Sequence, residues 1–138
     1  MLKKIDPISY PLVKQFYKMT RYGGAPGRQE TVWGWYEGSQ LIACVRIEPK
    51  GEAHFLRAMV VHPDYRGRGI GAKFLAEVMA QYEHHAIYCF PFSHLVTFYT
   101  EGGFSLCTDE GPQWFLQQYR RLSRQRDVVA MARITSKD

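Results

Sequence analysis

Three glycines that alternate with bulkier residues, two of them arginines, form the segment of this sequence best suited to chemistry. The segment consists of Arg66, Gly67, Arg68, Gly69, Ile70 and Gly71. Glycine has no side chain, so backbone N–H groups in such a loop can approach and wrap around an anion. Apolar residues at helical spacing follow from Phe74 onward, and the N-terminus of a helix adds partial positive charge. The pattern therefore predicts a cradle for a pyrophosphate.

Two nucleotide-binding motifs compete for the same glycines. Gly67, Gly69 and Ala72 satisfy the dinucleotide form G-x-G-x-x-A, but that motif follows its strand directly and expects an acidic residue about 20 positions further on. Here residues 62–66 intervene, and Cys89 and its neighbours stand where the acid is expected. A P-loop needs Gly-Lys followed by Ser or Thr, which this loop lacks. The sequence therefore argues against both nucleotide-binding folds.

The elements around the loop change from strands to helices. Residues 30–36, 41–47 and 55–61 are rich in apolar and β-branched side chains and are separated by tight turns, which predicts three antiparallel strands. Apolar residues from Phe74 to Tyr82 recur on one stripe of a helix. The other expected elements are a short first strand, a helix through Tyr22, a strand over 86–90, a helix capped by Ser93 and reaching Tyr99, a strand over 104–107, a helix carrying Phe115 to Leu122 and a final strand over 128–134.

Composition sets the broad class of the protein. Of the 138 residues, 46% are hydrophobic and 22% are charged, which predicts one globular domain over residues 1–138. The cysteines Cys44, Cys89 and Cys107 are far apart in apolar stretches, so we expect them to be reduced and buried, with no metal site. Without a signal-peptide core or an apolar run of about 18 residues, we expect a soluble cytoplasmic protein with no membrane partner.

The net charge of +5 favours anionic partners. A phosphorylated cofactor would account for this charge, and so would a nucleic acid. Four arginines cluster near the C-terminal end, namely Arg120, Arg121, Arg124 and Arg126. We interpret this cluster as a solvated helix face, with RNA binding as the less favoured alternative.

Two segments together resemble a known family. From Leu56 to Gln81 the sequence contains V-x-P-x-x-R-G-x-G-x-G before a helix, which resembles motif A of the GCN5-related N-acetyltransferases (GNAT). The stretch from Phe98 to Phe104 resembles motif B of that family, with a tyrosine four residues before the glycine of a Gly-Phe pair. The predicted order of elements also matches. The resemblance implies an α/β (α+β) fold: a mostly antiparallel sheet flanked by helices, with two splayed parallel strands at the cofactor cleft.

By this resemblance, the protein is expected to transfer an acetyl group from acetyl-CoA, its co-substrate, to a primary amine by direct attack in a ternary complex. The two splayed strands are then the one ending at Val61 and the one ending near Phe90. Backbone groups of the first strand are expected to pair with the pantetheine arm, and one N–H there to polarise the thioester carbonyl. The expected cofactor-binding residues are Met59, Val60, Val61, Arg66, Gly67, Arg68, Gly69, Ile70 and Gly71.

Tyr99 is the expected general acid, which protonates the thiolate expelled from acetyl-CoA. A tyrosine is protonated at neutral pH because its reference pKa is about 10. The alternative is a core tyrosine on one helix stripe with Leu95 and Phe98. Family members often carry an Asn seven residues before this tyrosine that touches the cofactor arm, whereas this chain has Phe92 followed by Ser93.

The general base and the acceptor are less determined by the sequence. Glu48, Glu52, His54 or water alone are the candidate bases. We expect the acceptor to lie between residues 22–28 and 108–127, and to be a small or amino-acid-like amine. The alternatives are an amine of a protein or an aminoacyl-tRNA, or an accessory or sensor protein that binds acetyl-CoA or RNA without catalysis. Exposed strands at the C-terminal edge also make a homodimer reasonable.

Overall fold

We describe a computed structural model of the protein over residues 1–107 and 109–134. Strands and helices follow one another in an order that agrees with the one expected from the sequence. Their bounds are β1 (Leu2–Lys4), α1 (Tyr10–Met19), β2 (Thr31–Glu37), β3 (Gln40–Lys50), β4 (Ala53–Val61), α2 (Ile70–Met79), β5 (Ala86–Cys89), α3 (Val96–Glu101), β6 (Ser105–Leu106), α4 (Gln113–Leu122) and β7 (Met131–Arg133). Among these described residues, no helix has both the length and the apolar character needed to cross a membrane.

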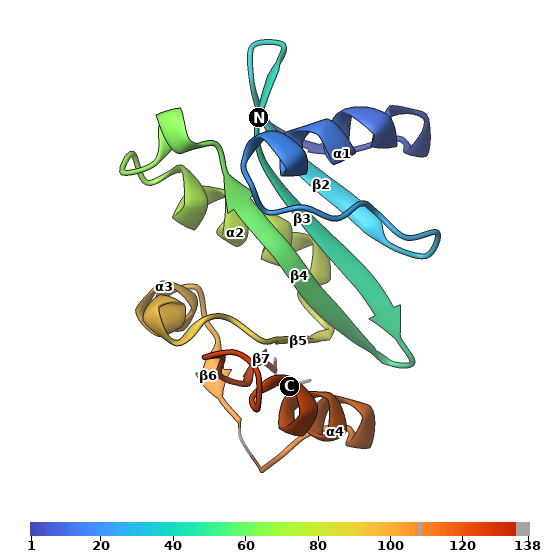
Figure 1. The fold of residues 1–138 in the computed structure, drawn as a ribbon, viewed down its shortest axis with the longest axis vertical. Coiled ribbons are helices and arrows are strands. Elements are labelled where there is room, and N and C mark those ends of the chain that lie inside the picture. Colours follow the sequence, from blue (N-terminus) through green and yellow to red (C-terminus); the bar gives the residue numbers. More distant parts are fainter. Residues whose placement is uncertain (108, 135–138) are drawn as a thin grey trace.

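The strands form one seven-stranded sheet in the order β1-β2-β3-β4-β5-β7-β6. All neighbouring strands run antiparallel except β4 and β5, which are parallel. The three consecutive antiparallel strands expected from the sequence are β2, β3 and β4 (Figure 1). The mixed, mostly antiparallel sheet flanked by helices is therefore confirmed.

Helices α1 and α2 pack on opposite faces of this sheet. Tyr17 of α1 clusters with Cys44 of β3, whereas Phe74 of α2 clusters with the next residue, Val45. Successive side chains of a strand point to opposite faces, so the two helices sandwich the strands between them. Both helices bury one apolar stripe, and α2 buries Phe74, Leu75, Val78 and Met79.

The remaining two helices cover the half of the sheet formed by β5, β7 and β6. Tyr99 of α3 clusters with Cys89 of β5, whereas Phe115 of α4 packs against Tyr88, whose side chain points to the other face. Figure 1 draws this half in yellow to red, below the half formed by β1 to β4 and α1. The two halves are joined where β4 pairs with β5 and by the core cluster that α2 shares with Tyr99 of α3.

Strands β4 and β5 pair over only three positions and then separate. Their register runs from Ala53 with Ala86 to Phe55 with Tyr88. Beyond Cys89 the chain forms an isolated bridge with the C-terminal segment, while β4 continues to Val61 (Figure 1). The expected splay of two parallel strands is thus present, because the chain after β5 turns to the C-terminal segment while β4 continues beside β3 alone.

Some local expectations were wrong. Helix α1 ends at Met19 rather than Tyr22, because the chain turns at Arg21, which has a φ of 62°. Ser93 does not cap α3, since its hydroxyl donates a hydrogen bond to Asp127 Oδ2 at 2.6 Å. The last strand covers only Met131–Arg133. All three cysteines are free, Cys44 and Cys89 buried as expected and Cys107 only half-buried.

Candidate active site

A β-bulge interrupts β4 just beyond its separation from β5. At this point one residue of β3, Val45, faces both Ala58 and Met59 of β4. Ala58 has a φ of 57°, in the left-handed region that costs a residue with a Cβ about 1–2 kcal/mol. The hydroxyl of Tyr17 donates a hydrogen bond of 2.7 Å to the Ala58 carbonyl and holds this conformation. The extra residue reverses the alternation of side chains, so that Leu56 faces α2 but Ala58 faces α1.

The bulge leaves one backbone edge of β4 open. The last β4 residue paired with β5 is Phe55, so Met59, Val60 and Val61 have β3 on one side and no strand on the other among the described residues. Backbone N–H and C=O groups seek hydrogen-bond partners. An extended ligand lying along this edge would supply them.

The glycine loop leads directly into α2. Gly67 and Gly69 have φ values of 78° and 76°, and a Cβ added at either would meet nothing within 4 Å. Both positions therefore require glycine for the backbone conformation, and both face open space. Gly69 immediately precedes the first residue of α2, where the free N–H groups of the first helical turn lie. The loop therefore has the backbone conformation and the open surroundings that an anion cradle would need.

The other residues of the loop have separate positions. The Arg66 side chain donates a hydrogen bond from Nε to the Val61 carbonyl at 3.0 Å. The Arg68 guanidinium lies over the ring of Tyr65, 5.2 Å from its centroid. At Gly71 a Cβ would come within 3.3 Å of Phe98, so this glycine lets α2 approach α3 closely. These arginines place two positive charges beside the N-terminus of α2.

A hollow of about 450 Å³, which we call the α2 hollow, lies between the end of β4, the start of α2 and α3. It brings together part of the expected cofactor site, because Met59, Val60, Val61, Arg66 and Gly71 line its wall. The other expected residues are not in this wall: Gly67, Arg68 and Gly69 lie in the exposed loop, and Ile70 is the half-buried first residue of α2.

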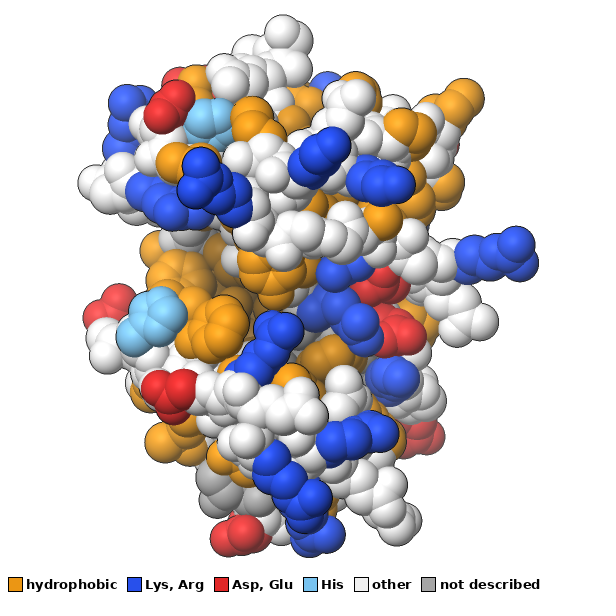
Figure 2. Space-filling model, in the orientation of Figure 1, with side chains coloured by type: hydrophobic (Ala, Val, Ile, Leu, Met, Phe, Trp, Pro, Cys, Tyr) orange, Lys and Arg blue, Asp and Glu red, His pale blue; other side chains and the backbone are white. Residues whose placement is uncertain are grey.

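A second hollow of about 290 Å³, the α4 hollow, lies between β4, β5 and α4. Its wall includes Arg46 and Arg57 from the sheet and Arg126 from the segment after α4. Figure 2 shows the surface depression between the two halves of the molecule, with Lys and Arg side chains in and around it. The two hollows share lining residues and therefore meet; these are Tyr22, Met59, Phe92, Leu95 and Tyr99.

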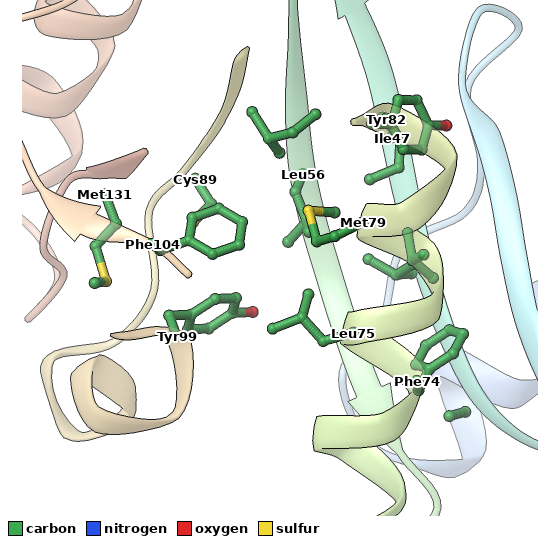
Figure 3. Packing of buried hydrophobic residues seen from close by; sticks show 14 residues of the cluster. Ile47, Leu56, Phe74, Leu75, Met79, Tyr82, Cys89, Tyr99, Phe104 and Met131 are labelled. Atoms are coloured by element: carbon green, nitrogen blue, oxygen red, sulfur yellow. The ribbon is translucent and has the colours of Figure 1, made fainter. Parts of the chain in front are cut away.

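Tyr99 lies where the two hollows meet, although it is also a core residue. It is 6% exposed, and its ring packs edge-on against Phe98 and Phe104 at centroid distances of 5.1 and 5.4 Å. Figure 3 shows the side chain reaching from α3 toward Leu75 of α2. Burial, and then nearby Cys89, raises the pKa of Tyr99 well above its ordinary value. Its hydroxyl therefore stays protonated at neutral pH.

The three candidate bases lie outside both hollows. Glu48 forms an ion pair with Arg57, with Oε1 and Nη2 2.6 Å apart, and Glu52 is exposed at the turn between β3 and β4. His54 packs edge-on against His85, and desolvation and then the charge of His85 lower the pKa of His54. Among the described residues that line the two hollows, there is no aspartate or glutamate.

A buried ionic network, which the sequence analysis missed, joins the strands beside the α4 hollow. Glu30 lies between Arg46 and Arg57, each with a guanidinium nitrogen 3.5 Å from one of its carboxylate oxygens. Arg46 also donates a hydrogen bond to the Ala25 carbonyl, which ties the segment after α1 to β3. The signal was present in the sequence, because Arg46 and Arg57 each interrupt an otherwise apolar strand.

Residues from both segments expected to form the acceptor walls line hollows of the structure. From residues 22–28, Tyr22 lines the α4 hollow, while Ala25, Gly27 and Arg28 line a separate depression beside Glu30. From the second wall, Gln118, Leu122 and Arg126 line the α4 hollow; Thr108 lies outside the described residues.

Phe92 stands where family members often carry an Asn that touches the cofactor arm. Its apolar ring lines both hollows.

Comparisons with known proteins agree with this architecture. Residues 28–106 match the family model described as "Acetyltransferase (GNAT) domain". A 69-residue segment is 36% identical to mycothiol acetyltransferase of Thermobispora bispora and covers 50% of this chain, but only 22% of that protein. The chain thus spans about a fifth of the length of this curated relative.

Solved structures of low sequence identity share the whole fold. N-acetylglutamate synthase from Neisseria gonorrhoeae, complexed with coenzyme A and N-acetyl-glutamate, superposes with a TM-score of 0.75 at 14% identity over 99% of this chain and 35% of that one. The ribosomal-protein-S18-alanine N-acetyltransferase from Escherichia coli gives a TM-score of 0.72 at 11% identity, over 100% and 96% of the two chains. With more than half of its residues in the family match, the chain belongs to the GNAT acetyltransferase family.

Proposed function

We propose that the protein transfers the acetyl group of acetyl-CoA to a primary amine by direct attack in a ternary complex. The observation that carries this proposal is that the α2 hollow and the α4 hollow meet beside the bulge of β4 and Tyr99. One hollow would hold the donor and the other the acceptor. The reacting atoms then come together without either substrate leaving the protein.

The α2 hollow suits acetyl-CoA. The loop of residues 66–71 would hold the pyrophosphate through its backbone N–H groups, the N-terminus of α2 and the charges of Arg66 and Arg68. The open edge of β4 at Met59 to Val61 would pair with the amides of the pantetheine arm. The thioester would then lie at the bulge, next to Tyr99.

The reaction can be written from these groups. The neutral amine attacks the thioester carbon, a C–N bond forms, and the carbonyl oxygen gains negative charge. A backbone N–H near Met59 would stabilise that charge. The C–S bond then breaks, the coenzyme A thiolate leaves, and the nitrogen loses its extra proton to water.

Tyr99 would act on the departing sulfur. Its hydroxyl, kept protonated by burial, would donate a hydrogen bond as negative charge develops on sulfur. Tyrosine holds its proton more tightly than a thiol, by about 1.5 pKa units on reference values, so complete transfer costs about 2 kcal/mol or more. Tyr99 would therefore stabilise the thiolate as a hydrogen-bond donor, instead of protonating it fully as the general acid expected from the sequence. The thiolate would receive its proton in the end from solvent.

A covalent acetyl-enzyme is not part of this proposal. Cys89 is the cysteine that lines the α4 hollow, and it is 2% exposed. Burial raises the pKa of its thiol well above the ordinary value, and the protonated thiol is a poor nucleophile. Direct attack by the amine accounts for the arrangement without a protein nucleophile.

The first experiment is calorimetric titration of the purified protein with acetyl-CoA, with NAD as the control. We expect acetyl-CoA to bind and NAD not to bind. A panel of amines is then tested for thiol release in the presence of acetyl-CoA. Absence of acetyl-CoA binding would contradict the proposal, because the α2 hollow and the glycine loop would then have no role in donor binding.

A further inference from the structure

We propose that the acceptor amine carries an anionic group, a carboxylate or a phosphate, which the arginines of the α4 hollow bind. This inference rests on the proposed function and narrows its acceptor to one chemical class. Arg46, Arg57 and Arg126 line this hollow, and no carboxylate side chain does so among the described residues.

The positive charge of this hollow is only partly offset by protein carboxylates. Glu30 and Glu48 pair with Arg46 and Arg57, but both acids line a separate depression, whose wall these two arginines share, and neither acid lines the α4 hollow. Buried charges are costly unless they are paired and hydrogen-bonded. The face of these arginines in the α4 hollow is therefore suited to an anion brought by a ligand.

Arg46 supplies a second, independent observation. It is only 9% exposed, and its Nε is buried with no hydrogen-bond partner among the described residues, as are Arg57 Nε and Glu30 Oε2 of the same network. A buried donor without a partner costs about 1–3 kcal/mol. These polar atoms leave the network incompletely satisfied, and both of its arginines are part of the wall of this hollow.

Arg126 approaches from the opposite wall. It follows α4, whereas Arg46 and Arg57 belong to β3 and β4, so the hollow presents guanidinium groups from two sides. Guanidinium groups bind carboxylates and phosphates through paired N–H donors. Basic side chains are visible on both sides of the depression in Figure 2.

The rest of the hollow fits a small carbon skeleton. Phe55, Phe90, Phe92 and Leu122 line it with apolar surface, and its volume of about 290 Å³ suits a metabolite of amino-acid size. The hollow thus combines an apolar wall with an anion site. An α-amino acid with an apolar side chain has this combination of groups.

The arginines would also assist the chemistry. Positive charges near an amine disfavour its protonated, ammonium form and so lower its pKa. The arginines therefore increase the fraction of neutral amine that can attack the thioester. This effect is useful here because neither hollow holds an acidic base among the described residues. An anionic group on the acceptor would bring its amine into this field.

The test uses amines that are matched except for the anion. Phenylalanine is compared with 2-phenylethylamine, and O-phosphoethanolamine with ethanolamine, so that the two pairs separate carboxylate from phosphate. Binding to the protein saturated with coenzyme A is measured by calorimetry, and kcat/KM with acetyl-CoA by thiol release. We expect at least one anionic member to exceed its neutral partner about tenfold, which corresponds to about 1.4 kcal/mol.

Arg126→Gln is the main variant, because Arg126 is exposed and its replacement leaves the buried network intact. We expect it to remove most of the preference for the anionic amine, and Arg57→Gln to do the same. Arg120→Gln is the matched control, since Arg120 lies on α4, is exposed and is not part of the wall. Thermal melting verifies that each variant is folded.

The outcomes separate this inference from the proposed function. If acetyl-CoA binds but no anionic amine binds or reacts better than its neutral partner, the inference is wrong and the donor site stands. The same conclusion follows if Arg126→Gln and Arg57→Gln behave like Arg120→Gln with every amine. If acetyl-CoA does not bind, the proposed function fails, and this inference fails with it.

Discussion

The hydrogen bond between Tyr17 and Ala58 should control both the stability of the protein and its affinity for acetyl-CoA. Tyr17 is fully buried, and its hydroxyl donates to the Ala58 carbonyl at 2.7 Å. Tyr17→Phe removes the donor and leaves that carbonyl without its side-chain partner. The cost of a buried unsatisfied group is about 1–3 kcal/mol. In a chain of this size that corresponds to a fall in Tm of roughly 3–10 °C.

The effect on the site follows from the conformation of Ala58. Its left-handed backbone costs about 1–2 kcal/mol, and Tyr17 offsets that cost. Without the hydroxyl, β4 can relax toward a regular strand, which would change the position of Met59 and the open edge beside it. We expect the Kd for acetyl-CoA to rise roughly fivefold, about 1 kcal/mol. Ala58→Gly relieves the strain and should restore part of both losses in the double variant.

The assays are thermal melting by circular dichroism and calorimetric titration with acetyl-CoA. Tyr10→Phe is the matched control, because Tyr10 lies on the same helix and donates to a backbone carbonyl, that of Glu30, away from the bulge. We expect a smaller loss of Tm and an unchanged Kd in the control. If Tyr17→Phe changes neither Tm nor Kd, the bulge does not depend on this hydrogen bond and the reasoning is refuted.

Three further predictions concern the loop, the hydroxyl and pH. Tyr99→Phe should lower kcat at least tenfold with little change in acetyl-CoA affinity, as measured by thiol release and calorimetry; unchanged kcat would exclude a role for the hydroxyl. Gly69→Ala should weaken acetyl-CoA binding and lower the free energy of unfolding by about 1–2 kcal/mol. Gly38→Ala is the control, because Gly38 also has a positive φ, of 61°, and open space around it. It should cost similar stability and leave acetyl-CoA binding unchanged. Desolvation, and then the charge of His85, lower the pKa of His54 in the folded protein. Near that pKa the unfolded chain binds more protons than the folded protein, so the free energy of unfolding should fall as pH drops through about 6.5. His54→Gln should flatten that dependence in denaturant titrations at pH 7.5 and 5.5, and an equal slope would contradict it.

The sequence alone predicted the features that depend on neighbouring residues. The glycines at 67 and 69 indicate positive φ values, because other residues rarely adopt that conformation. Apolar stripes and alternating strands predicted the order of elements, since each periodicity reports which face is buried. The family resemblance was carried by these same local patterns, and residues 28–106 match the family model.

Tertiary structure decided the features that depend on residues far apart in the chain. No glycine in the sequence indicates the bulge at Ala58. The bulge is stabilised by a hydrogen bond from Tyr17, 41 residues away. The sequence showed Arg46 and Arg57 as charges within apolar strands, but only the fold places Glu30 between them and brings both arginines into the wall of a hollow.

The place of Tyr99 was likewise undecided in the sequence, because a helix stripe does not say whether a buried ring also borders a hollow. The structure gives it both positions, in the core and where the two hollows meet. The separation of β4 from β5 makes this dual position available, and it arises because the chain after Cys89 pairs with the C-terminal segment instead. Local periodicity determines which elements form, whereas the choice of partners among distant segments determines where hollows lie between them.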